Sequence, residues 1–95
     1  MDWNTMHTHF DEEISDALKY KGMAEHMDGC DRQVLMDMAW EEYAHAKHLC
    51  RMMKEHGVDT ASHEDTLRKV KETFFEIISC AIPCAKFTFK VCMKL

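Results

Sequence analysis

The chain has 95 residues, of which 31% are charged and 46% are hydrophobic, and its net charge is −5. A chain of this length can form one domain with a small core. It has no apolar run of about 18 residues, so we expect no membrane span, and its polar first residues do not resemble a secretory signal. The acidic balance also argues against nucleic-acid binding.

The cysteines and the helix-breaking residues further restrict the structural class and the cellular location of the protein. Five cysteines without regular spacing favour reduced thiols and a cytoplasmic location over a disulfide framework, although one disulfide is compatible with the pattern. The only proline is Pro83, and glycine occurs at positions 22, 29 and 57 alone. Because Met, Ala, Leu, Glu and Lys fill the stretches between these breakers, the sequence predicts an all-α protein.

The first helix is expected at residues 8–28. Thr8 and Asp11 resemble a capping box at its start, and the acidic run at 11–13 suits the positive end of the helix dipole. Gly22 lies inside this helix, where it either weakens the helix or lets a neighbouring helix approach closely. The expected core-facing residues recur at helical spacing: Phe10, Ile14, Ala17, Leu18, Met23 and Met27.

A second helix is expected at residues 31–56, with Asp31 as its N-cap and Gly57 as its stop. The turn that precedes it covers only residues 28–31. A turn this short forces the first two helices into an antiparallel hairpin. The expected core-facing residues of the second helix are Leu35, Met38, Ala39, Ala46, Leu49, Met52 and Met53.

A third helix is expected from about residue 62 to residue 81, started by a capping-box variant at Ser62 and Asp65 and ended by Pro83. Its expected core-facing residues are Leu67, Val70, Phe74, Ile77, Ile78 and Ala81.

The basic, apolar tail at residues 84–95 fits a strand or a helix, and we expect it to pack on a partner subunit rather than on a membrane. We divide the chain into a helical hairpin at 1–57 and a C-terminal helix with its tail at 58–95, both within one domain. Cys80 and Cys84 are four residues apart, and we interpret them as small buried side chains rather than as redox or metal-binding thiols.

The pair Glu42 and His45 carries the chemistry of the second helix. Residues three apart lie on one face of a helix, so this carboxylate and this imidazole can bind one metal ion together. Counted from Gly29, Glu13 lies as far before the turn as His45 lies after it, roughly 20–24 Å at about 1.5 Å per residue. The hairpin therefore places Glu13 level with Glu42 and His45. Tyr20 lies two turns beyond Glu13 on the same face. From there its hydroxyl can hydrogen-bond to a metal-binding side chain without itself contacting the ion.

These residues form half of a dinuclear site, because the complete arrangement takes a Glu from two helices and Glu-x-x-His from two others. The chain has no internal repeat, so two copies would complete it as a homodimeric four-helix bundle. A mononuclear site finished by solvent is the alternative. A further alternative treats Glu42 and His45 as an ordinary solvated surface pair.

The spacing Glu13-x6-Tyr20, followed by Glu41-Glu42-Tyr43-Ala44-His45, resembles the ferritin-like di-iron superfamily. The similarity covers about residues 8–56 and is closest to short half-ferritins of the encapsulated type and to rubrerythrin-like helical domains. It implies that Glu13, Glu42 and His45 bind iron, that Tyr20 occupies the family tyrosine position and that Trp40 occupies a tryptophan position near the motif. No encapsulin-targeting tail and no rubredoxin-type cysteine pairs are recognised after Gly57.

The expected function is oxidation of Fe(II) to Fe(III) by O2 at a site shared between two chains of a homodimer or larger homo-oligomer. Carboxylate and imidazole donors suit iron, with Mn and Zn as alternatives. The competing functions are a rubrerythrin-like protein that reduces peroxide or stores metal, and a helical interaction module without enzymatic activity.

Several nearby residues receive weaker interpretations. Glu41 is either a transient site for an incoming ion or a surface charge. His48 either extends the row formed by Glu42 and His45 or is a partly exposed helix residue. His56 lies in the last turn of the second helix, where the helix dipole favours a cation. No role is assigned to the remaining histidines: His7, His9, His26 and His63.

Overall fold

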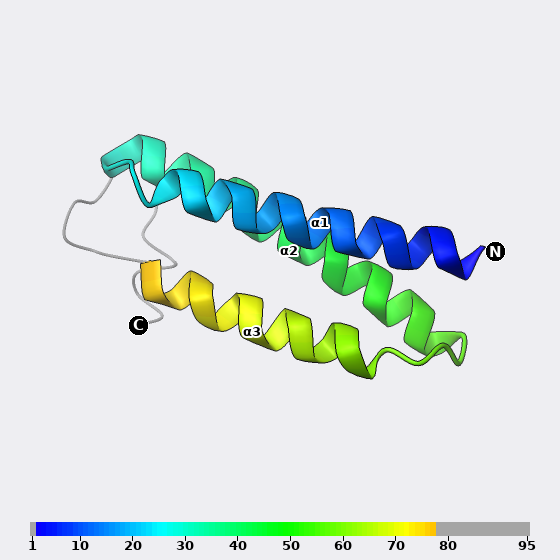
Figure 1. Cartoon of the computed structure of the whole chain (residues 1–95). Coiled ribbons are helices and arrows are strands. Elements are labelled where there is room, and N and C mark those ends of the chain that lie inside the picture. The colour runs from blue at the N-terminus through cyan, green and yellow to red at the C-terminus, as the bar shows by residue number, and fades with distance from the viewer. Residues whose placement is uncertain (1, 78–95) are drawn as a thin grey trace.

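The computed structural model describes residues 2–77, and every regular element within that range is an α-helix. The elements are α1 (Trp3–Ala24), α2 (Gly29–Glu55) and α3 (Ala61–Ile77) (Figure 1). The all-α prediction is therefore confirmed for this part of the chain. The predictions for the end of the third helix, Pro83, the tail at 84–95 and the pair Cys80 and Cys84 lie outside the described residues.

α1 begins five residues earlier than predicted because Asp2, not Thr8, caps it. The Oδ1 atom of Asp2 accepts hydrogen bonds from the backbone N–H of Asn4 at 3.0 Å and of Thr5 at 3.4 Å. These bonds satisfy two of the N–H groups that the first helical turn leaves without partners. The acidic run at 11–13 consequently lies well inside the helix, so its predicted interaction with the helix dipole does not apply.

α2 begins at Gly29, two residues before the predicted start, and its N-cap is Asp28 rather than Asp31. The side chain of Asp28 makes no capping hydrogen bond. At the other end, Gly57 has a φ of +79°, the left-handed conformation that glycine adopts at helix stops without steric cost. The predicted stop at Gly57 is confirmed.

α3 begins as expected near residue 62, but its predicted capping box does not form. The backbone N–H of Ala61 donates instead to Asp59 Oδ1 at 3.0 Å. Asp65 uses its carboxylate for ion pairs with Arg68 and with Lys69, at 2.9 Å in the second case. The competing basic side chains one turn further along the helix explain why Asp65 does not reach back to Ser62.

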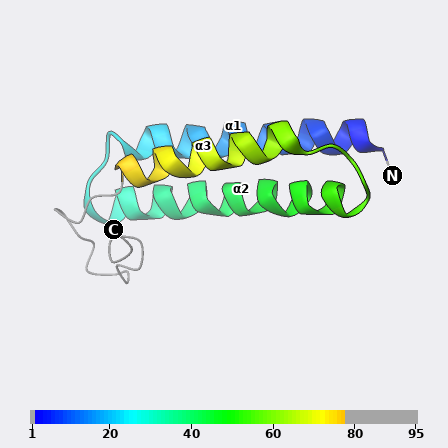
Figure 2. The ribbon, with the colours of Figure 1, turned by 90° about the horizontal axis from the view of Figure 1, so that it is seen from below.

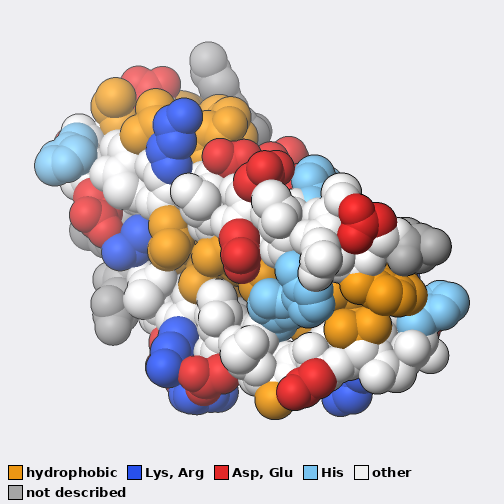
Figure 3. Space-filling model, turned by 45° about the vertical axis from the view of Figure 1, so that its right-hand side comes forward, with side chains coloured by type: hydrophobic (Ala, Val, Ile, Leu, Met, Phe, Trp, Pro, Cys, Tyr) orange, Lys and Arg blue, Asp and Glu red, His pale blue; other side chains and the backbone are white. Residues whose placement is uncertain are grey.

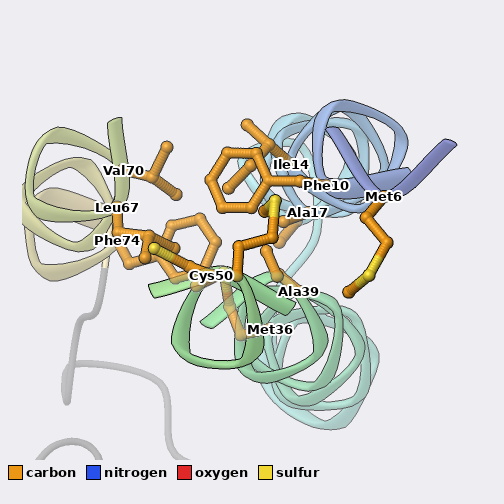
Figure 4. Packing of buried hydrophobic residues seen from close by; sticks show 13 residues of the cluster. Met6, Phe10, Ile14, Ala17, Met36, Ala39, Cys50, Leu67, Val70 and Phe74 are labelled. Carbon is orange, nitrogen blue, oxygen red and sulfur yellow. The ribbon is translucent and has the colours of Figure 1, made fainter. Parts of the chain in front are cut away.

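α1 and α2 form the predicted antiparallel hairpin, and α3 runs along its length (Figures 1 and 2). Buried side chains from all three helices point into a common interior (Figure 4). Phe10, Phe74 and Met53 are the largest side chains that are almost fully enclosed. Within the described residues, the buried hydrophobic side chains are Met6, Phe10, Ile14, Ala17, Ala24, Met36, Ala39, Ala46, Cys50, Met53, Leu67, Val70 and Phe74.

Four residues predicted to face the core are exposed: Leu18 at 41%, Met23 at 44%, Met27 at 43% and Met52 at 36%. Three helices enclose only part of each helix surface, so apolar positions away from their common interior remain in contact with water. Helical spacing alone predicted a wider apolar face than one chain can cover.

Gly22 does not serve a close helix contact, since a methyl group added there would meet no atom within 4 Å. Of its two predicted roles, only the weakening of the helix applies.

No helix within residues 2–77 combines the length and the apolar character needed to cross a bilayer. Of the two cysteines in that range, Cys50 is a buried free thiol, whereas Cys30 is disulfide-bonded. The disulfide at Cys30 is the alternative that the cysteine pattern left open, and the free thiol of Cys50 fits the expectation of reduced cysteines.

Candidate metal centre

Glu13, Glu42 and His45 converge at one level of the α1–α2 hairpin. Each offers one ligand atom, and these three atoms all lie within 4.8 Å of one another. His45 Nδ1 lies 3.4 Å from Glu13 Oε2 and 3.8 Å from Glu42 Oε2. The equal count of residues on both sides of the Gly29 turn therefore placed Glu13 at the correct height.

The exposure of the three side chains is graded. Glu13 is 13% exposed, Glu42 is 23% exposed and His45 is 58% exposed. Two carboxylates thus line the inner wall of the cluster, while the imidazole covers it from the solvent side. An ion bound there would keep positions open to water or a small oxidant.

The electrostatics of the cluster favour a cation. The pKa of the Glu42 carboxyl is raised above its ordinary value, first by its hydrogen bond with Glu13, then by desolvation and by repulsion from the Glu13 carboxylate. His45 opposes this rise. Two carboxylates this close cannot both ionise cheaply, and a bound cation removes that cost.

One atom of the cluster lacks a protein partner. Glu13 Oε2 is buried and forms no hydrogen bond, because the nearby imidazole nitrogen of His45 contributes only an ion-pair contact at 3.4 Å. A buried carboxylate oxygen without a partner is costly unless a ligand satisfies it. Two donors that are each about 2.1 Å from one ion can be up to about 4.2 Å apart, so the contacts of 3.4 and 3.8 Å fit a shared ion.

Tyr20 and Trp40 do not join this cluster. Tyr20 is half-buried against the core, and its hydroxyl makes no hydrogen bond with a described residue. The Trp40 ring packs edge-on against Tyr43 and Phe74, with ring centroids 5.5 and 4.8 Å apart. Trp40 therefore faces α3, whereas Glu42 and His45 lie on the other flank of α2.

The neighbouring candidates also stay apart. Glu41 and His48 are exposed, and neither belongs to the group of ligand atoms that meets within the described residues. The His56 ring instead packs against Trp3, with ring centroids 5.3 Å apart. The predicted extension of the cluster to His48 is absent from this structure.

Sequence reasoning missed two histidine contacts. His9 Nε2 lies 3.2 Å from Glu13 Oε1, a contact that the spacing of four residues could have indicated. His7 Nδ1 lies 2.7 Å from His63 Nε2 and joins α1 to α3, which no local pattern could have predicted. Histidine side chains (pale blue) lie among acidic and hydrophobic ones on the face drawn in Figure 3.

A groove of about 440 Å³ lies between α2 and α3, away from this cluster. Tyr43 and Leu67 contribute to its apolar lining, and basic side chains surround them. Lys54 Nζ already pairs with Glu64 at 2.7 Å, and Arg68 pairs with two carboxylates of α3. Because these cations are largely neutralised, the groove is a weaker candidate for a functional site than the carboxylate–imidazole cluster.

The described hairpin thus brings two carboxylates and an imidazole to one level, a group of side chains that could hold a metal ion. Comparison with protein-family models, with curated proteins and with solved structures finds no match to this chain.

Proposed function

We propose that this chain binds Fe(II) at Glu13, Glu42 and His45 and oxidises it to Fe(III) with O2. The observation that carries this proposal is the convergence of three ligand atoms from two helices within 4.8 Å. Carboxylate oxygen and imidazole nitrogen suit iron, manganese and zinc, and only iron and manganese among these change oxidation state.

We further propose that two chains complete the centre. Three protein donors leave the shell of one ion unfinished, and the dinuclear carboxylate site needs a second Glu and a second Glu-x-x-His. A two-fold axis beside the cluster would supply them from a second copy and bring two ions close together. The occupant of this face is therefore a second copy of the same chain.

The surface around the cluster supports such a pairing. We define the seam as the set of residues on one flank of the hairpin whose spacing alternates between four and three: His9, Glu13, Asp16, Tyr20 and Met23 on α1, and Met38, Glu42, His45, Leu49 and Met52 on α2. This is the heptad spacing by which helices pack against partner helices. Met23 and Met52 are exposed there, and a second copy would cover them.

The protein residues bind the ion and balance its charge in this reaction. Glu13 and Glu42 offset the positive charge that increases when each Fe(II) loses one electron. His45 supplies the third protein donor to the ion. Two Fe(II) ions supply two electrons, so one O2 with two protons from solvent becomes H2O2 while two Fe(III) ions form.

Anaerobic titration with Fe(II) tests the site assignment. We expect one ion per chain for the wild type and a loss of binding for Glu42→Ala and for His45→Ala. Admission of O2 should then raise the absorbance near 310 nm as Fe(III) forms. Unchanged binding by both variants would show that the ions bind elsewhere.

The same titration separates the alternative functions. Oxidation by H2O2 but not by O2 would favour a peroxide-reducing protein. Fe(II) or Zn(II) binding without oxidation would favour metal storage. The absence of any metal binding would leave a helical interaction module.

A further inference from the structure

We infer that His9 is a positioning residue for the candidate metal centre and holds the Glu13 carboxylate so that Oε2 faces the ion. This inference rests on the proposed metal-binding function. It concerns a residue of α1 that lies outside the three-ligand group.

His9 connects the surface to a buried ligand. It lies one helical turn before Glu13, and its Nε2 is 3.2 Å from Glu13 Oε1. The His9 side chain is 53% exposed, whereas that of Glu13 is 13% exposed. Its other ring nitrogen, Nδ1, lies 3.6 Å from Glu12 Oε2, so contacts on both sides restrain the imidazole.

The two oxygens of Glu13 have different surroundings. Oε1 meets His9 at 3.2 Å, while Oε2 is buried without a hydrogen bond, 3.4 Å from His45 Nδ1. With Oε1 engaged, the carboxylate presents a single oxygen to an ion and cannot turn freely about its last side-chain bond. Partners outside the ligand shell commonly orient metal-binding carboxylates in this way.

The contact differs from an ordinary exposed pair at a spacing of four residues. In such a pair both side chains are solvated, and either can leave without consequence for the rest of the protein. Here one partner is a mostly buried carboxylate whose second oxygen belongs to the ligand cluster. Loss of His9 should therefore change metal binding more than it changes the stability of the metal-free fold.

Titration of the full chain with Co(II), followed by the visible absorption of the bound ion, tests this inference. We expect His9→Ala to raise the Co(II) dissociation constant by about 10–100-fold, the range typical for residues that orient metal ligands. His9→Gln should stay close to the wild type, because its amide N–H can donate a hydrogen bond to Glu13 Oε1 in place of the imidazole contact. His48→Ala, at an exposed histidine on α2, is the matched control.

The thermal midpoint of each metal-free variant shows whether a loss of Co(II) affinity comes from the binding site or from a less stable fold. We expect the midpoints of wild type, His9→Ala and His9→Gln to agree. The inference is overturned if His9→Ala binds Co(II) as the wild type does, or if His9→Gln loses as much affinity as His9→Ala. If the wild type itself binds no Co(II), Fe(II) or Zn(II), the proposed function fails first, which distinguishes the two failures.

Discussion

At the scale of single residues, two contacts between distant parts of the chain shift the pKa of an ionisable side chain. The pKa of Glu42 is raised, and the largest cause is hydrogen bonding with the neighbouring Glu13 carboxyl, followed by desolvation. On the other side of α1, burial lowers the pKa of His63, the adjacent His7 adds to this effect, and Asp11 opposes it. The first contact favours a bound cation, and the second favours a neutral imidazole.

The His63 contact predicts a pH dependence of stability. The unfolded chain binds a proton at His63 more readily than the folded chain does, since the folded-state pKa lies below 6.5. The stabilisation is therefore complete above pH 6.5 and is lost as the pH falls through the folded-state pKa. Protonation would also disturb the contact of 2.7 Å with His7. Thermal midpoints, measured by circular dichroism, should decrease as the pH is lowered from about 7.5 to about 5.

His63→Asn removes this titrating group and should show a smaller fall in midpoint over the same interval. His48→Asn, an exposed control on α2, should behave as the wild type does. If the wild type and His63→Asn lose the same number of degrees, burial of His63 contributes nothing to the pH dependence.

At the scale of secondary-structure elements, the α1–α2 hairpin is the closely packed unit and α3 is attached along one flank. Aromatic contacts hold α3 in place: Phe74 packs against Trp40 with ring centroids 4.8 Å apart, and Phe10 packs against His63 at 4.0 Å. The Trp40 contact lies on the flank of α2 away from Glu42 and His45, and the Phe10 contact joins α3 to α1. α3 therefore completes the core without covering the candidate metal centre.

Replacement of glycine by alanine should have opposite effects on stability at Gly22 and at Gly57. Gly22→Ala should stabilise the protein by about 0.5–1 kcal/mol, because the position is helical and an added methyl group meets no atom within 4 Å. Gly57→Ala should destabilise it by about 1–2 kcal/mol, because φ is +79° at that position. Urea unfolding of both variants measures the difference. A stabilising Gly57→Ala would show that the left-handed conformation is not needed for the α2 stop.

At the scale of the whole molecule, the seam leaves apolar side chains in water on both sides of the candidate metal centre. Met23 is 44% exposed and Met52 is 36% exposed. Both the uncovered surface and the missing donors are explained if two hairpins pair across the seam. The acidic cluster then becomes part of an interface, where bound cations offset the repulsion between facing carboxylates.

This pairing predicts a dimer that depends on metal. Sedimentation should show a dimer for metal-loaded wild type and a weaker dimer after chelation, because binding of an ion shared by two chains favours their association. Met23→Glu should raise the dimer dissociation constant by roughly 100-fold, because it buries an unpaired charge. Leu18→Glu is the matched control, since Leu18 is 41% exposed on α1 but lies off the seam. A monomer with and without metal would contradict the proposed pairing.

The sequence by itself determined the helical class, the hairpin and the level of Glu13 against Glu42 and His45. These follow from local rules: helix breakers are few, the turn is short, and a helix rises by a constant distance per residue. The start of α1 was predicted wrongly at Thr8 because two polar residues, Asp2 and Thr8, can each cap a helix, and local sequence does not rank them.

Only the tertiary structure decided which apolar residues are buried and which partners the histidines meet. Met23 is predicted from the sequence to face the core with Phe10 and Ile14, yet it is exposed, because it lies on a side of α1 that the other helices leave uncovered. The contact between His7 and His63 joins residues far apart in the sequence, and the burial of Glu13 Oε2 depends on atoms from both helices of the hairpin. Such features arise from packing between helices, and the periodicity of one helix carries no information about its neighbours.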